Sequence, residues 1–399
     1  MPDGRGATLL EDLPEEIIDT ILTRLPSKDV GRCRAVSASW RSATSTPEFM
    51  LRHHRRQPSL PIIDGRGMVV ALGAGVLWPF LPGAKHRDKV RLRGACDGLL
   101  AVSWGSRSYV CNPVIRKHAL LPQPQIHQNQ IGFAQDVDNA IIGFYHHHPT
   151  RELRVLWVSQ HLHKYSLYIL TLGSDRPRHV EVRLPTASPY SMEHKLLAVL
   201  FCSIHFPVVD HGNLHWHPYC ATYLTGVDEQ IIVFDTQVES FRWMPCPPRM
   251  SYNLKLFNMK GRLAFSGSSR YPDTGVDVWV MQDYDAEIWA FKYRIDLSVV
   301  DQAPFKREKQ IPLNSRVKWM RGIASMAALD DGELLGMFDA RHALRCDIDG
   351  RFLGLVNVGT GQYCMEFTQL RLKESIIPFP YHAMQGEDGE EEPFSIEHV

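Results

Sequence analysis

The sequence lacks the features of secreted and disulfide-stapled proteins. It has no Asn-x-Ser/Thr acceptor for glycosylation, and its first residues contain neither the basic nor the apolar region of a secretory signal. Its eight cysteines are scattered over 399 residues without a Cys-x-x-Cys pair, which indicates reduced and mostly buried thiols. These absences predict an intracellular location, in the cytoplasm, the nucleus or both.

The sequence also has little that favours a membrane or a nucleic acid. Its most apolar stretch, residues 68–84, is shorter than the roughly 20 residues of a spanning helix and is broken by Pro79, Pro82 and three glycines. Lysine plus arginine number 44, and aspartate plus glutamate also number 44, so no whole-chain field attracts a polyanion. We therefore expect strands and turns at 68–84, and neither a membrane nor a nucleic-acid partner.

Catalytic motifs are absent as well. The chain contains none of the patterns Gly-x-Ser-x-Gly, His-Glu-x-x-His, Gly-x-x-x-x-Gly-Lys and Gly-x-Gly-x-x-Gly, which position nucleophiles, zinc or phosphates. His215 and His217 share one face of an expected strand and could hold a metal with His205 or His211, but no cysteine or carboxylate spacing supports such a site. The sequence predicts no enzyme activity, no cofactor and no metal.

Residues 11–26 are rich in apolar side chains for so short a segment. Pro14 suits the first turn of a helix, because its missing N–H would have no partner there. The apolar residues that follow fall within an arc of about 140° on a helix; they are Ile17, Ile18, Ile21, Leu22 and Leu25. Pro26 disfavours helical geometry at the residue before it and ends this helix. One broad apolar face results.

Further short helices are expected before residue 57. Ser27 is a candidate N-cap of a second helix, Ser37 of a third, and Pro47 suits the start of a fourth. In the fourth helix, Phe49 and Met50 are expected to face inward, whereas residues 52–56, including His53, are expected to face solvent. Because a unit this small buries little of its surface, part of the apolar surface should belong to an interface.

The order of these residues resembles the F-box, a helical module that binds a Skp-type adaptor. The matching positions are Leu13, Pro14, Glu16, Ile18, Ile21, Leu22, Arg24, Leu25, Pro26, Arg34, Val36, Ser37, Trp40, Pro47 and Phe49. Two departures, Ala38-Ser39 and Ala43-Thr44, should weaken packing of the third helix. The resemblance implies adaptor contacts, and through the adaptor a cullin; the contacts are expected at Leu13, Pro14, Ile17, Ile18, Ile21, Leu25, Pro26, Val30, Val36 and Trp40.

From about residue 62, apolar runs of strand length alternate with turn residues. One unit recurs as a tight turn followed by leucine; it is found at Asp97-Gly98-Leu99, Gly212-Asn213-Leu214, Gly261-Arg262-Leu263 and Gly332-Glu333-Leu334. A second unit is an apolar strand that ends in an Asn or Asp able to hold the next turn; it is found at Asn112, Asp235 and Asp339. Repeated antiparallel units of this length predict an all-β propeller of about six blades.

The same region resembles the F-box-associated domain of plant F-box proteins, a kelch-like propeller, over most of residues 95–300. The resemblance rests on "CDGLL", "CNPVIRKHALLP", "VFDTQVESFRWMP" and "VDVWVMQDYDAEIW". The expected organisation has four parts: an F-box of three to four short helices at 8–56, a linker at 57–61, a propeller at 62–376 and an acidic, disordered tail at 377–399.

The two resemblances together imply a substrate-recognition subunit of a Skp-cullin-F-box ubiquitin ligase, without catalytic residues of its own. The segments 122–136, 185–197 and 247–254 are longer than strand closure requires, so they are candidates for binding a client protein, with Tyr190 and Tyr252 as anchors. The alternative is a lectin-like or small-ligand-binding propeller on which the helical module docks internally. Adaptor binding distinguishes the two.

Overall fold

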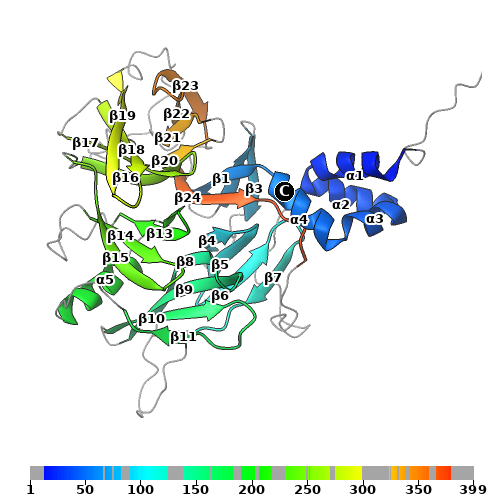
Figure 1. The fold of residues 1–399 in the computed structure, drawn as a ribbon, viewed down its shortest axis with the longest axis horizontal. Coiled ribbons are helices and arrows are strands. Elements are labelled where there is room, and N and C mark those ends of the chain that lie inside the picture. The colour runs from blue at the N-terminus through cyan, green and yellow to red at the C-terminus, as the bar shows by residue number, and fades with distance from the viewer. Residues whose placement is uncertain are drawn as a thin grey trace, which may run out of the picture.

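The chain folds into a small helical module followed by a β-propeller (Figure 1). The computed structural model describes residues 13–65, 68–73, 76–81, 90–124, 138–161, 164–182, 190–202, 206–217, 230–248, 250, 252–269, 275–298, 323, 325–329, 332–337, 342–358 and 365–378. In that part of the chain, no helix is both long and apolar enough to cross a membrane.

The helical module has the four short helices that the sequence predicts. They are α1 (Glu15–Arg24), α2 (Ser27–Val36), α3 (Ala38–Thr44) and α4 (Pro47–Arg56). Ser37 caps α3 as predicted, because its hydroxyl accepts a hydrogen bond from the Trp40 amide at 3.4 Å. The prediction for Ser27 is wrong: Pro26 occupies the cap position, and Ser27 is the first helical residue, with a buried hydroxyl that has no hydrogen-bond partner.

The core of this module brings together one face of each of several helices. Leu22, Val30, Phe49 and Met50 are buried in it. The expected solvent position of His53 is wrong, since His53 is fully buried and its Nε2 lies 2.9 Å from the Leu25 carbonyl oxygen. Residues 49, 50 and 53 share one face of α4, so the helical period carries His53 inward with its apolar neighbours. Burial lowers the pKa of His53, which favours the neutral ring.

The propeller consists of six four-stranded antiparallel sheets, which confirms the predicted fold class and number of blades. From the innermost strand outward, the first sheet contains β24 (Met365–Lys373), β1 (Ser59–Gly65), β2 (Met68–Gly73) and β3 (Val76–Leu81). The second contains β4 (Arg91–Cys96), β5 (Leu99–Trp104), β6 (Arg107–Asn112) and β7 (Lys117–Leu120). The third contains β8 (Asp138–His147), β9 (Glu152–His161), β10 (Lys164–Thr171) and β11 (Arg178–Val180).

The remaining three sheets follow the same order. The fourth contains β12 (Val208–Asp210), β13 (Asn213–Trp216), β14 (Gln230–Asp235) and β15 (Ser240–Pro245). The fifth contains β16 (Tyr252–Met259), β17 (Arg262–Ser268), β18 (Gly275–Asp283) and β19 (Ile288–Asp296). The sixth contains β20 (Met326–Ala328), β21 (Leu334–Met337), β22 (His342–Cys346) and β23 (Phe352–Asn357). One helix, α5 (Tyr190–Cys202), lies between the third and fourth sheets in sequence.

The two ends of the chain close the ring. Strand β24 is the innermost strand of the first sheet and pairs antiparallel with β1, with Leu60 opposite Leu372. Hydrophobic clusters lie between neighbouring sheets; Ile62 and Leu100 belong to the cluster between the first and second sheets, and Ile63 and Leu335 to the one between the sixth and first. Each sheet therefore depends on its neighbours for its core, as expected of propeller blades.

The predicted turn repeat marks the turns between first and second strands. Asp97 and Gly98 have φ values of 48° and 82°, and the same left-handed pair recurs at His211-Gly212 and Lys260-Gly261. A left-handed tight turn suits the twist of a hairpin, which explains the recurring glycine. The second unit marks the end of the third strand at Asn112 and Asp235, whereas Asp339 lies outside the described residues.

Two of the expected domain boundaries, those of the linker and of the tail, differ from the structure. The stretch 57–61 is not a free linker, because β1 begins at Ser59 and Gln57 is buried with its Nε2 donating to the Leu25 carbonyl at 3.3 Å. At the other end, β24 ends at Lys373, and residues 374–377 pack against the helical module. The tail predicted to be disordered lies outside the described residues from 379 onward.

Candidate adaptor-binding surface

The helical module carries large apolar side chains on its outer surface. The four most exposed are Ile17 at 47%, Ile21 at 41%, Val36 at 77% and Leu51 at 48%. In α1, Ile18 and Leu22 face the module core, while Ile17 and Ile21, one turn apart, face outward. The module core covers only part of the apolar face predicted for this helix. The remaining part, with Ile17 and Ile21, is exposed to solvent.

The ten residues expected to bind an adaptor fall into three groups. Ile17, Ile21, Val36, Pro14 and Pro26 are exposed. The side chains of Ile18, Leu25 and Trp40 are partly buried against the module core, and Leu13 is half-buried. Val30 is fully buried, so it can support an interface only through the fold.

Leu51 was not selected from the sequence, although it is exposed on α4. Phe49 and Met50 occupy the inward face of that helix, and Leu51 lies at the next position around the helix, which turns it away from the core. The sequence signal for an exposed apolar residue at this position is a leucine directly after the two inward-facing residues of α4. The basic residues that follow it make this part of the helix look uniformly polar.

Polar contacts hold the helices that carry the exposed surface. Arg52 of α4 forms an ion pair with Asp19 of α1. Arg34 of α2 donates through Nε to the Thr44 hydroxyl at 3.0 Å, and that hydroxyl donates to the Trp40 carbonyl at 2.7 Å. Thr44 is fully buried, so a polar bridge forms at one of the two departures from the F-box pattern, Ala43-Thr44.

The candidate client residues lie on the propeller face opposite the helical module. Because the strands of each sheet alternate in direction, the connections between sheets emerge on one face and the turns between first and second strands on the other. The module enters at the start of β1, a second strand, and therefore sits on the turn face. Tyr252 begins β16 directly after a connection between sheets and is 45% exposed.

The other candidate anchor, Tyr190, begins helix α5, and its side chain lies outside the described residues. The expected loop at 185–197 is partly this helix, which packs Leu196, Leu197 and Leu200 against the third and fourth sheets. That part of the segment has a structural role. The structure describes no residue from 125 to 137, so most of the first candidate loop lies outside it.

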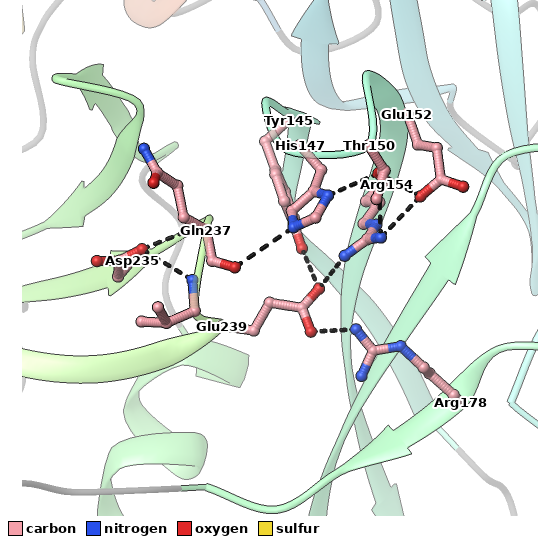
Figure 2. A network of polar contacts seen from close by, with 10 residues as sticks. Tyr145, His147, Thr150, Glu152, Arg154, Arg178, Asp235, Gln237 and Glu239 are labelled. Carbon is pink, nitrogen blue, oxygen red and sulfur yellow. Dashed lines mark hydrogen bonds and ion pairs between the residues drawn. The ribbon is translucent and has the colours of Figure 1, made fainter.

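A dense polar network joins the third and fourth sheets on the turn face (Figure 2). The Glu239 carboxylate accepts hydrogen bonds from Arg154 at 2.6 Å, from Tyr145 at 3.3 Å and from Arg178. Burial opposes ionisation of Glu239, but the hydrogen bonds and charges of Arg178 and Arg154 outweigh burial and lower the pKa of the carboxyl. Both oxygens of Glu239 are engaged by the protein itself, so the network locks two blades together.

Two of the histidines considered as metal ligands, His215 and His217, make other contacts. His215 is buried, with Nδ1 3.1 Å from the Val208 carbonyl and Nε2 2.8 Å from the Tyr284 hydroxyl. His217 packs edge-on against Phe265, and His205 lies outside the described residues. Within the described ranges, no three His, Cys, Asp or Glu side chains cluster in a way that could hold a metal ion.

Comparison with known proteins identifies two domains in this chain. The F-box associated beta propeller domain matches residues 85–311, and the F-box domain matches residues 10–52. The F-box protein At5g18160 of Arabidopsis thaliana is 23% identical over 309 residues, covering 72% of this chain and 72% of that protein. The F-box protein At3g07870 of the same plant is 24% identical over 376 residues, covering 85% of each. The F-box/LRR-repeat/kelch-repeat protein At1g09650, also from Arabidopsis thaliana, is 23% identical and covers 67% of this chain and 73% of that protein.

Proposed function

Because this chain belongs to the F-box associated beta propeller family and carries an F-box in front of the propeller, we propose that it is the substrate-recognition subunit of a Skp-cullin-F-box ubiquitin ligase. The F-box binds a Skp-type adaptor and, through it, a cullin, while the propeller binds a client protein. Catalysis belongs to the partner subunits. This chain brings the client protein close to the adaptor and the cullin. Two binding sites on one chain raise the local concentration of one partner near the other.

The observation that carries the proposal is the uncovered apolar surface of the helical module. Ile17, Ile21 and Val36 are exposed although a buried hydrophobic cluster lies beneath them. Exposed isoleucines on one helix face contribute to a protein interface by leaving water, and each contributes up to about 2 kcal/mol when fully covered. Leu51 is added to the predicted contact set, and Val30 acts through the module core.

The proposed client surface lies on the face of the propeller that carries the connections between sheets, with Tyr252 and Tyr190 as its aromatic anchors. A position opposite the F-box leaves this face open when the adaptor is bound. Inside a reducing compartment cysteines stay as thiols, and the cysteines in the described part of the chain form no disulfide. Burial raises the pKa of the Cys111 and Cys346 thiols to about 12, which leaves them unreactive near neutral pH.

The test measures the affinity of the full chain for a purified Skp-type adaptor. The double variant Ile17→Asp with Ile21→Asp should lose adaptor affinity by at least about 100-fold, since two carboxylates would be buried without partners in the interface. The control is Val238→Asp, at a valine on the propeller that is more exposed than either isoleucine, and this variant should bind as wild type.

Unchanged adaptor affinity in the double variant, with its helical content intact by circular dichroism, would exclude this interface. Client capture in cells treated with a proteasome inhibitor tests the second part. Tyr252→Ala should reduce the captured client while leaving adaptor binding unchanged. Equal capture by this variant and wild type would remove Tyr252 from the client surface.

A further inference from the structure

Residues 374–377 lie between the helical module and the propeller, at the end of the strand that closes the ring (Figure 1). Ile376 is buried in the same hydrophobic cluster as Leu22, Val30 and Phe49. Ile377 and Val114, from the propeller side, pack against that cluster. The core of the helical module is therefore completed by a residue more than three hundred positions away in the sequence.

Hydrogen bonds tie the same segment to both neighbours. On the module side, the Glu374 carbonyl oxygen lies 2.9 Å from His54 Nδ1 of α4. On the propeller side, Asn112 donates through Nδ2 to the Ser375 carbonyl at 3.0 Å and to the Ile377 carbonyl at 3.4 Å. Gly98 lets this segment approach closely, because a Cβ there would lie 2.4 Å from the Ser375 Cβ.

Asn112 differs from its counterparts elsewhere in the ring. The third strands of the fourth and fifth sheets end in Asp235 and Asp283, and Asp347 directly follows that of the sixth. In each of these, the carboxylate accepts hydrogen bonds from amides of the following turn. Asn112 makes the same bond through Oδ1, to the Val114 amide at 3.0 Å, and adds a donor group that a carboxylate lacks.

We propose that residues 374–377 are a docking segment that fixes the orientation of the helical module on the propeller, with Asn112 as its positioning residue. Two cavities of about 400 and 180 Å³ flank Glu374, so apolar packing alone does not seal the junction. Its geometry therefore depends on Ile376 and on the Asn112 amide. The docking itself is independent of the proposed ligase role; only its consequence, a fixed distance from adaptor to client, rests on that role.

The first test measures the distance distribution between Ser42 of α3 and Asp285 of the propeller, both exposed, in the full chain without an adaptor. Spin labels are attached through a non-canonical amino acid, because the chain has eight cysteines. Wild type should give a narrow distribution, and Asn112→Asp a broad one, since a carboxylate would face two carbonyl oxygens. The matched control Asp235→Asn makes the same chemical change in reverse, away from the junction, and should stay narrow.

A narrow, unshifted distribution in Asn112→Asp overturns the role of Asn112. If that variant loses its fold, Ile376→Ser decides by hydrogen exchange. Amides of α1 and α4 should exchange at least about tenfold faster in Ile376→Ser, while those of the fourth and fifth sheets stay as in wild type. Ile348→Ser, at an exposed isoleucine of the sixth sheet, is the control and should leave all of them unchanged. Unchanged exchange of α1 and α4 in Ile376→Ser overturns the docking segment.

Discussion

The helical module and the propeller bury their apolar side chains in different ways. Each sheet of the propeller shares hydrophobic clusters with the sheets beside it, and β24 closes the ring so that no sheet lacks a neighbour. The module has one small cluster, takes Ile376 from the far end of the chain to complete it, and still leaves Ile17, Ile21 and Val36 exposed. In a closed ring, every sheet buries its apolar side chains against neighbouring sheets. A small helical unit cannot bury all of its apolar surface by itself and depends on contacts from outside.

The strongest way to break this comparison is to remove one large core side chain from each part. Phe49→Ala in the module and Phe234→Ala in the propeller each delete a fully buried ring, at a cost of about 3–5 kcal/mol. We expect Phe49→Ala to unfold the module alone, with loss of amide protection in α1–α4 and normal protection in the propeller. Phe234→Ala should instead lower the thermal midpoint of the whole ring. Loss of protection throughout the chain in Phe49→Ala would show that the two parts unfold as one.

A smaller effect is expected where two blades are locked by charge. Glu239→Gln leaves the largely buried Arg154 with one of its two carboxylate partners, Glu152, and we expect a loss of about 2 kcal/mol in the free energy of unfolding. Urea unfolding measures this change. Asp175→Asn, at the neighbouring exposed pair with Arg176, is the control and should leave the urea midpoint unchanged. A midpoint equal to wild type in Glu239→Gln would mean that water replaces this network without cost.

The smallest effect concerns pH. Burial lowers the pKa of His215 to about 4, so the unfolded chain binds a proton at this position more readily than the folded chain does. Stability from this group is complete above about pH 6.5 and is lost as the pH falls toward 4. Between pH 7 and pH 5.5, the free energy of unfolding should fall by about 1 kcal/mol less in His215→Gln than in wild type. Urea unfolding at each pH measures this difference.

Asp64 provides the opposite control. Burial, together with the nearby Glu366, raises the pKa of Asp64 to about 6. Its contribution to stability is therefore complete below about pH 3.8 and is lost as the pH rises through 6. Asp64→Asn should steepen the loss of stability on acidification, whereas His215→Gln should make it shallower. If the slope of the free energy of unfolding against pH changed in the same direction in both variants, these assignments would be contradicted.

Local patterns predicted much of the architecture because they act over a few residues. Pro26 and Pro47 mark the end of one helix and the start of another, and the glycines after Asp97, His211 and Lys260 supply the backbone conformation of a tight hairpin. The F-box spacing predicted which helices carry an exposed apolar surface. It did not predict which apolar side chains face outward, since that depends on where the other helices pack.

The sequence by itself determined the four helices, the hairpin repeat and an apolar surplus in the first helix, because propensity, proline geometry and turn chemistry are properties of neighbouring residues. Tertiary structure alone decided that Gln57 is buried against the module, that β1 begins at Ser59 within the expected linker, and that Ile376 completes the module core. Each of these depends on contacts between segments far apart in the chain. Periodicity within one segment cannot report them.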